Sequence, residues 1–358
     1  MSASTHPSGR LAPPRVEEVS AGVYAYIQPD GTWWINNTGF VVGASRVAAV
    51  DACATEARTR SFLAAIAATT GGRPVRTLVN THHHGDHTHG NYLFGDATIV
   101  AHERCRSEIL AEGPPGTSKL VKSGTWTDVA WGEIRTAPPF LTYTDRVSLY
   151  VDELRCEVIH VGTPAHSTND SIVWIPERRV LFAGDLLFNG GTPFLLAGSV
   201  TGALVAVAAL RDLGAETIVP GHGPVCGPEV IDHVLAYLNF VLDLARTATA
   251  AGVGPLEAAR SADLGQFTRL TDPERLVGNL HRAYAELAGT PRGAPIDVIG
   301  ALADMVAYNG GKPLTCLALG RPAQRATVPE GSTCLVRPTV RRPAPRPAGR
   351  RVFIRSSR

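Results

Sequence analysis

The segment THHHGDHTHG, residues 81–90, constrains this chain more than any other part of its sequence. Four of its side chains, His82, His84, Asp86 and His87, follow the pattern HxHxDH. Residues two apart in an extended segment point to one side, so the imidazoles of His82 and His84 can reach a single ion. Asp86 and His87 follow at a turn and can serve a second ion. Neutral imidazole and carboxylate suit zinc and similar divalent metals, and this spacing is a poor fit to a chance surface loop.

The residues before the motif predict a strand, a helix and a second strand. Residues 54–69 have helical spacing and end at a pair of glycines. Residues 75–79 predict a buried strand that stops at Asn80, directly before the motif. The carboxyl end of such a strand is where α/β proteins place their chemistry, so we expect the functional site there.

The rest of the chain predicts a second group of strands followed by helices. Residues 97–111 predict a strand and a helix, 112–125 a loop, and further strands cover LTYTDRVSLYV, LRCEVIHVG, SIVWIP and RVLFAGD. Helical segments are predicted at 201–213, 229–249, 255–261, 273–288 and 296–308. Two β-rich halves with helices outside them predict an α/β fold, a four-layer αββα sandwich with extra C-terminal helices.

Three further residues are candidate metal ligands. His166 lies in the turn GTPAHSTND, Asp185 ends the apolar run VLFAGD, and His222 lies between glycines in IVPGHGP. Each has an ordinary structural explanation when it is taken alone. All three in this order after HxHxDH are hard to attribute to chance.

With these residues the sequence resembles the metallo-β-lactamase superfamily, from about Val16 to Val225. The resemblance implies two zinc ions: the first held by His82, His84 and His166, the second by Asp86, His87 and His222, with Asp185 bridging them. An aspartate at the bridging position is similar to glyoxalase II and the lactonases. True β-lactamases usually carry cysteine or serine there, which disfavours antibiotic hydrolysis. Flavodiiron proteins carry glutamate where this chain has His84, which disfavours oxygen or nitric-oxide reduction.

The charges of such a site suggest a mechanism. Two dications are offset by only two carboxylates, so a water between them should ionise near pH ~7 rather than near its bulk value of about 15.7. The resulting hydroxide would attack an ester, thioester or lactone carbonyl. We predict that Asp86 is catalytic because it can orient this nucleophile and shuttle its proton.

A narrower resemblance concerns the substrate. The stretches PAHSTNDSIVWIPERRVLFAGDLLFNGGTPF and ADMVAYNGGKPLTCLA are similar to the metallo-β-lactamase-fold thioesterase/cyclases of aromatic polyketide pathways. This resemblance implies a small-molecule acyl substrate carried on an acyl carrier protein, with ring closure as well as hydrolysis. Ten of the chain's 34 basic residues lie in 321–358 with one acid, which leaves 1–320 with a net charge of −7. An acidic body does not favour an acidic carrier, and it argues against nucleic-acid binding.

Three alternatives stay open. A glyoxalase II-like enzyme would need a cationic patch for glutathione, for which Arg282 and Arg292 are available. A lactonase fits the seven ligands equally well, although Phe188 and Asn189, and no tyrosine, follow Asp185. A nucleic-acid-processing metalloenzyme could use the Arg-rich tail as an electrostatic handle.

Composition also divides the chain and suggests its location. We predict a disordered N-terminus over 1–15, a catalytic domain over 16–250, a C-terminal helical extension over 251–318 and a disordered Pro/Arg-rich tail over 319–358. The first residues lack the apolar core of a signal peptide, and no apolar run reaches the roughly 18–20 residues of a membrane span. Six scattered cysteines suit reduced thiols, so we predict a cytoplasmic protein.

Several other residues are predicted to be structural. His83 and His89 fall outside the ligand pattern and are expected to support the site or to be exposed. His160 is expected in the core or behind the ligands, while Met305 and Tyr308 are expected to pack a helix.

Overall fold

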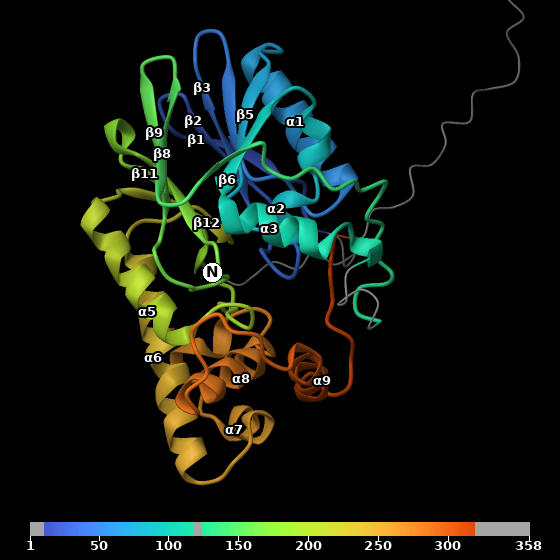
Figure 1. Ribbon diagram of the computed structural model, residues 1–358, viewed down its shortest axis with the longest axis vertical. Coiled ribbons are helices and arrows are strands. Elements are labelled where there is room, and N and C mark those ends of the chain that lie inside the picture. Colours follow the sequence, from blue (N-terminus) through green and yellow to red (C-terminus); the bar gives the residue numbers. More distant parts are fainter. Residues whose placement is uncertain (1–10, 118–123, 319–358) are drawn as a thin grey trace, which may run out of the picture. The chain divides into compact units, whose positions relative to one another are not determined.

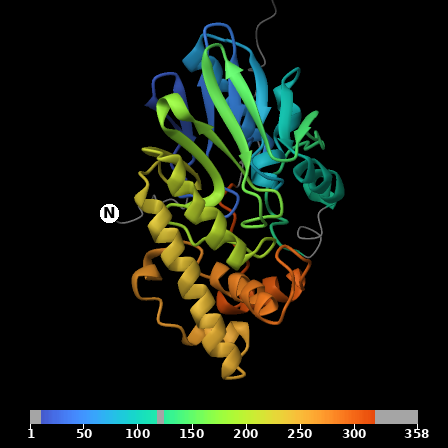
Figure 2. The same cartoon turned by 60° about the vertical axis from the view of Figure 1, so that its left-hand side comes forward.

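The computed structural model describes residues 11–117 and 124–318, in which two mixed β-sheets face each other between helices (Figures 1 and 2). The first sheet has the order β1 (Arg15–Ser20), β2 (Val23–Ile27), β3 (Thr38–Val42), β4 (Val47–Val50), β5 (Val75–Val79), β6 (Thr98–His102) and β7 (Leu141–Tyr143). The second has the order β12 (Thr217–His222), β11 (Val180–Phe188), β10 (Ser171–Ile175), β9 (Leu154–His160) and β8 (Arg146–Val151). Strands β4 to β7 are parallel, as are β11 and β12.

Three apolar clusters join the layers. Between the sheets, Val41 of β3 lies in one cluster with Val158 of β9 and Phe182 of β11. On the outer face of the first sheet, α1 (Glu56–Thr70) packs Phe62 and Ile66 against strand residues. The helices α5 (Val200–Ala209) and α6 (Glu229–Ala250) cover the second sheet in a third cluster. The four-layer αββα sandwich is therefore confirmed.

Local sequence signals explain where α1 begins and ends. Thr55 accepts a hydrogen bond from the amide of Arg58, which caps one of the unpaired N–H groups at the helix start. Gly71 ends the helix with φ 66°, a left-handed conformation that suits glycine. The other described helices are α2 (Gly85–Thr88), α3 (Glu103–Glu112), α7 (Pro255–Ser261), α8 (Arg275–Leu287) and α9 (Val298–Tyr308). They lie where the sequence predicts helices, except for α2, which interrupts the predicted motif loop.

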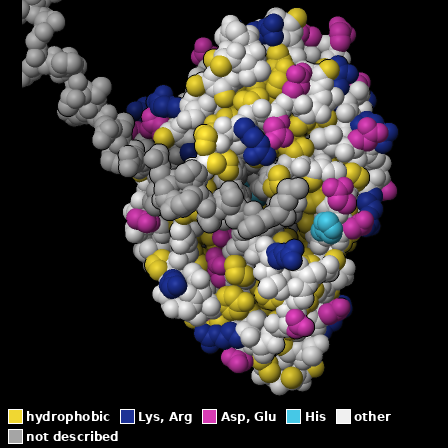
Figure 3. Space-filling model, turned by 180° about the vertical axis from the view of Figure 1, so that it is seen from behind, with side chains coloured by type: hydrophobic (Ala, Val, Ile, Leu, Met, Phe, Trp, Pro, Cys, Tyr) yellow, Lys and Arg dark blue, Asp and Glu magenta, His cyan; other side chains and the backbone are white. Residues whose placement is uncertain are grey.

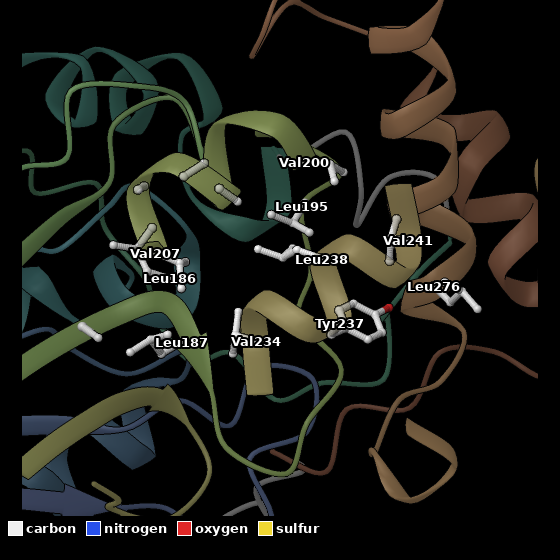
Figure 4. Packing of buried hydrophobic residues seen from close by; sticks show 14 of the residues in the cluster. Leu186, Leu187, Leu195, Val200, Val207, Val234, Tyr237, Leu238, Val241 and Leu276 are labelled. Atoms are coloured by element: carbon white, nitrogen blue, oxygen red, sulfur yellow. The ribbon is translucent and has the colours of Figure 1, made fainter. Parts of the chain in front are cut away.

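The C-terminal helices share a core with the second sheet. Leu238 and Val241 of α6 pack in the same cluster as Leu276 of α8 and Leu186 of β11 (Figure 4). Met305 of α9 is fully buried in this cluster, and Tyr308 packs against the cluster, which confirms their predicted packing role. The segment predicted as a helical extension is therefore continuous in packing with the second sheet.

Two predictions on the chain's environment can be compared with the structure. No helix among the described residues is both long and apolar enough to span a bilayer. The cysteines in the described ranges, Cys53, Cys105, Cys156, Cys226 and Cys316, are free thiols. Cys334, the predicted tail and most of the predicted N-terminal segment lie outside the described residues.

Candidate metal centre

The predicted site residues meet where strands of both sheets end. β5 of the first sheet leads through Asn80 into the motif, whose Asp86 and His87 lie on the single turn α2. Asp185 lies on β11, and His222 ends the parallel neighbour β12. His166 follows β9 in a loop. The two sheets thus each supply part of the site.

Three histidines form the first group. The ligand atoms of His82, His84 and His166 all lie within 4.8 Å of one another. His82 Nε2 lies 3.1 Å from His84 Nδ1, and that same atom lies 2.7 Å from His166 Nε2. Three imidazole nitrogens that point at one place can supply three of the ligands of a tetrahedral or five-coordinate metal ion.

Asp86, His87, Asp185 and His222 form the second group, again within 4.8 Å of one another. His222 Nε2 lies 3.3 Å from Asp86 Oδ2 and 3.2 Å from Asp185 Oδ2. Gly221, next to His222, permits this approach, because a Cβ there would collide with Asp185 Oδ1. The group combines two imidazoles with two carboxylates.

Asp185 connects the two groups. Its Oδ2 lies 3.3 Å from His166 Nε2 of the first group, and its Oδ1 lies 3.0 Å from His87 Nε2 of the second. The position of this carboxylate between the groups agrees with the bridging role that the resemblance implies.

Fixed acceptors orient three of the imidazoles. His87 Nδ1 donates to Asp51 Oδ2 at 2.9 Å, and His222 Nδ1 donates to the carbonyl of Gly31 at 3.1 Å. His166 Nδ1 donates to the carbonyl of Phe194 at 2.5 Å. Each bond places the proton on Nδ1 and leaves the Nε2 lone pair directed into the site. This is the usual arrangement of a metal-binding histidine in proteins.

Charge within the site favours cations. Burial and the neighbouring imidazoles hold the pKa of His82 and His84 well below the usual value for histidine, so both are neutral. Burial opposes protonation of His222 as well, but contact with Asp185 and Asp86 raises its pKa to about 9. The buried carboxylates therefore require positive charge beside them, which metal ions would provide.

Unpaired atoms in the site fit the same conclusion. His87 Nε2 and Asp185 Oδ1 are both buried and lie 3.0 Å apart, but with the His87 proton on Nδ1 both are acceptors, and neither has a hydrogen bond among the described residues. Buried polar atoms left unpaired cost roughly 1–3 kcal/mol each, unless a ligand binds them. The donor set, its geometry and these unpaired atoms all fit a pair of metal ions.

The remaining motif histidines have supporting positions. His83 Nδ1 lies 3.0 Å from Asn169 Nδ2, and burial lowers the pKa of His83 to about 4. His89 Nδ1 donates to the carbonyl of Ala54 at 3.2 Å and its ring stacks on Trp34. Neither belongs to the two groups. His160 is only half-buried and stacks on His102 with ring centroids 4.0 Å apart, and it belongs to neither group, so the prediction that it lies in the core is not confirmed.

Asp51 is a site residue that sequence reasoning missed. Its carboxylate accepts hydrogen bonds from the amide and the hydroxyl of Thr81, at 2.7 and 2.8 Å, as well as from His87. The sequence does contain a signal for Asp51. It directly follows the apolar strand VAAV, just as Asp185 comes at the end of the apolar run VLFAG.

Comparison with known proteins identifies the family. A family model described as the metallo-beta-lactamase superfamily matches residues 31–222, more than half of the chain. The chain belongs to this superfamily. The matched region contains all seven residues of the two groups, which fit a binuclear metal site of the family's type.

Individual relatives within the superfamily are distant. The chain is 27% identical over 185 residues to the 2,4-dinitroanisole O-demethylase subunit alpha of Nocardioides sp., a match that covers 51% of each chain. It is 29% identical over 196 residues to a hydroxyacylglutathione hydrolase of Rhodospirillum rubrum, covering 53% of this chain and 62% of that one. The chain therefore spans less than two thirds of the length of these relatives.

Two further matches are to a thioesterase and to a solved structure. An acyl-coenzyme A thioesterase, MBLAC2 of Bos taurus, is 27% identical over 165 residues, which cover 42% of this chain and 57% of that one. The solved metallo-beta-lactamase from Pontibacter korlensis has a TM-score of 0.51 at 19% identity, covers 63% of this chain and 99% of its own length, and shows a shared fold. None of these names describes a polyketide thioesterase or cyclase, so that narrower resemblance stays a prediction.

Proposed function

We propose that this chain is a binuclear zinc-dependent thioesterase, which hydrolyses a small-molecule acyl thioester. The observation that carries the proposal is the carboxylate of Asp185, which reaches ligand nitrogens of both groups at 3.0–3.3 Å. A carboxylate in this position would bridge two ions and bring both to bear on one carbonyl. His82, His84 and His166 would hold the first ion, and Asp86, His87 and His222 the second.

The residues around the ions supply positioning and proton transfer. When bound, the two ions act as Lewis acids and lower the pKa of water into the neutral range. Asp86 has the more exposed carboxylate of the two acids, with 11% of its side chain accessible against 4% for Asp185. Asp86 therefore takes the proton of the attacking water and returns it to the sulfur as the carbon–sulfur bond breaks.

An aromatic side chain lies against imidazoles of both groups. The ring of Phe188 stacks on His222 with centroids 5.0 Å apart and lies 6.0 Å from the ring of His166. An aromatic ring beside the site favours an acyl chain or ring over a strongly polar group.

The alternatives have less support. Arg282, predicted to be available for glutathione, is 1% exposed and donates to the carbonyls of Leu196 and Ala294, so it is no free cation. Phe188 lies over His222, and no tyrosine follows Asp185 as the lactonase alternative would lead us to expect. On the face shown in Figure 3, basic and acidic side chains of the described residues are interspersed, which does not favour a nucleic-acid surface.

The stretches NDSIVW and AYNGG support a β-ketoacyl or aryl group like those of polyketide enzymes. The test compares an aryl thioester, a β-ketoacyl thioester, homoserine lactones, S-lactoylglutathione and nitrocefin at identical zinc loading. We expect the aryl and β-ketoacyl thioesters to be cleaved fastest, with activity lost on chelation and in His84→Ala. A preference for nitrocefin, lactone or lactoylglutathione would overturn the proposal. The same acyl group on coenzyme A and on an acyl carrier protein then tests the carrier.

A further inference from the structure

Helix α8, which lies beyond the family match, carries three buried polar side chains on one face. Arg275, Asn279 and Arg282 are spaced by four and three residues, so they project from the same side of the helix. They are only 2%, 0% and 1% exposed. Leucine or methionine would be the expected residue types at such positions, because burying a guanidinium costs several kcal/mol unless it is well paired.

All three side chains bind the backbone of the 192–196 loop. Arg275 Nη1 donates to the carbonyl of Thr192 at 3.1 Å. Asn279 makes two bonds: Nδ2 donates to the Pro193 carbonyl at 2.7 Å, and Oδ1 accepts from the Leu195 amide at 2.8 Å. Arg282 donates twice to the Leu196 carbonyl, at 3.0 and 2.6 Å. The loop is thereby fixed at four of its five residues.

This loop supplies the acceptor for a metal-site histidine. The carbonyl of Phe194, between the atoms that Asn279 holds, accepts the 2.5 Å hydrogen bond from His166 Nδ1. The orientation of His166 therefore depends on the loop, and the loop depends on α8. Arg282 has no ion pair within 4.0 Å among the described residues, so its cost of burial is offset mainly by the carbonyls of Leu196 and Ala294 that it binds.

Arg275 is linked to the second group of candidate ligands through aromatic rings and not through Phe194. Its guanidinium lies over Trp33 at 4.2 Å and beside Phe188 at 5.4 Å, and its Nη2 lies 2.9 Å from Asp272 Oδ2. Phe188 in turn stacks on His222, with ring planes only 4° apart. The order Trp33, Arg275, Phe188, His222 is a continuous stack that ends on a metal-site imidazole.

We propose that the polar face of α8 is a positioning element for both metal sites: Asn279 and Arg282 act through Phe194 on His166, and Arg275 acts through Phe188 on His222. The inference rests on the proposed role of His166 and His222 as zinc ligands. Residues that orient ligands from behind typically change metal affinity by about 10–100-fold when they are removed. We expect about 10-fold weaker zinc binding when any one of the three is replaced.

The test measures zinc affinity by competition with a chromophoric chelator. The variants are Asn279→Leu, Arg282→Met and Arg275→Met, with Arg282→Lys and Arg275→Lys as conservative versions that keep the charge and one donor. Tyr284→Phe is the matched control, since it removes a 2.8 Å hydrogen bond between α8 and the Val253 carbonyl and does not involve the loop. The lysine versions should bind zinc more tightly than the methionine versions, and the control should bind as the unaltered protein does.

Double variants separate positioning from mere destabilisation. If Asn279 acts through His166, then Asn279→Leu should weaken zinc binding in the unaltered protein but add little in a His166→Ala background. The same holds for Arg275→Met in a His222→Ala background. Additive losses, or losses of melting temperature in metal-free protein with unchanged zinc affinity, would overturn the inference. If the unaltered protein binds no zinc, the proposed function fails instead.

Discussion

The region matched by the family model, 31–222, and the region after it, 223–318, both bury polar side chains, but they do so differently. In the first region the seven candidate ligands lie at or after strand ends and come together in one site. In the second, Arg275, Asn279 and Arg282 lie on one face of a helix and bind the backbone of the first region. This difference leads us to propose that the first region supplies the chemistry and that the second holds its ligands in place.

The largest expected effect comes from the residue that joins the two groups. Asp185→Asn removes a charge that touches His166, His87 and His222, so turnover should fall by about 100-fold or more, at least as much as removal of a residue that only orients a ligand. The measurement is thioester hydrolysis together with bound zinc. Asp304→Asn in the second region, where Asp304 pairs with His281, is the matched control and should keep both. Equal losses of turnover and of bound zinc in the two variants would contradict the proposed difference between the regions.

The shared core predicts that the regions unfold together. Leu276 on α8 is 2% exposed and packs with residues of β11 and α6, so Leu276→Ala should lower the free energy of unfolding by about 2–5 kcal/mol. Leu287→Ala near the end of the same helix, at 40% exposure, should change it little. Denaturant unfolding followed by two spectroscopic probes is the measurement. Two separate transitions, with only one shifted by Leu276→Ala, would show that the second region folds alone.

Asp51 in the first region and Asn279 in the second are both proposed to orient a metal-site histidine, so their effects on zinc affinity can be compared directly. Asp51→Asn weakens the acceptor for His87 Nδ1, and zinc affinity should fall by about 10–100-fold. This loss should be at least as large as that of Asn279→Leu, because Asp51 contacts its histidine without an intervening loop. Zinc competition on both variants decides the order, and a larger effect of Asn279→Leu would reverse our view of which region dominates positioning.

The smallest effect concerns a histidine of the first region that is not near the metal groups. Burial and the neighbouring His160 lower the pKa of His102, whose Nδ1 accepts from the Arg104 amide and therefore prefers the neutral form. A lowered folded pKa stabilises the protein above the unfolded pKa of about 6.5, and that stability is lost as pH falls through the folded pKa. In His102→Asn, which keeps an acceptor at the helix cap, unfolding should depend less on pH between 7.5 and 5.5, as checked by urea denaturation of chelated protein. Parallel pH curves would contradict this role.

The sequence predicted the layers and the seven residues that the fold brings together, because both depend on local patterns. Apolar runs followed by His, Asp or Gly mark strands that end in a site, and helical spacing predicted the ends of α6 to α9 to within two residues, whereas the helix predicted at 201–213 ends as an α-helix at Ala209. Arg275 and Arg282 could not be found in this way. On a sequence, an arginine on a helix indicates a solvated face, and only the fold shows that the 192–196 loop covers it. Asp51 is an intermediate case. It directly follows an apolar strand, as a site residue would, but it belongs to no recognisable motif.

The most direct test of the account is the metal content of the purified chain. Elemental analysis after zinc-supplemented expression and exhaustive dialysis should find about two zinc ions per chain, since the two groups offer a complete set of ligands. His84→Ala and Asp185→Asn should each retain less. A content near zero in the unaltered protein, or a content unchanged by both substitutions, would contradict the site on which every other conclusion rests.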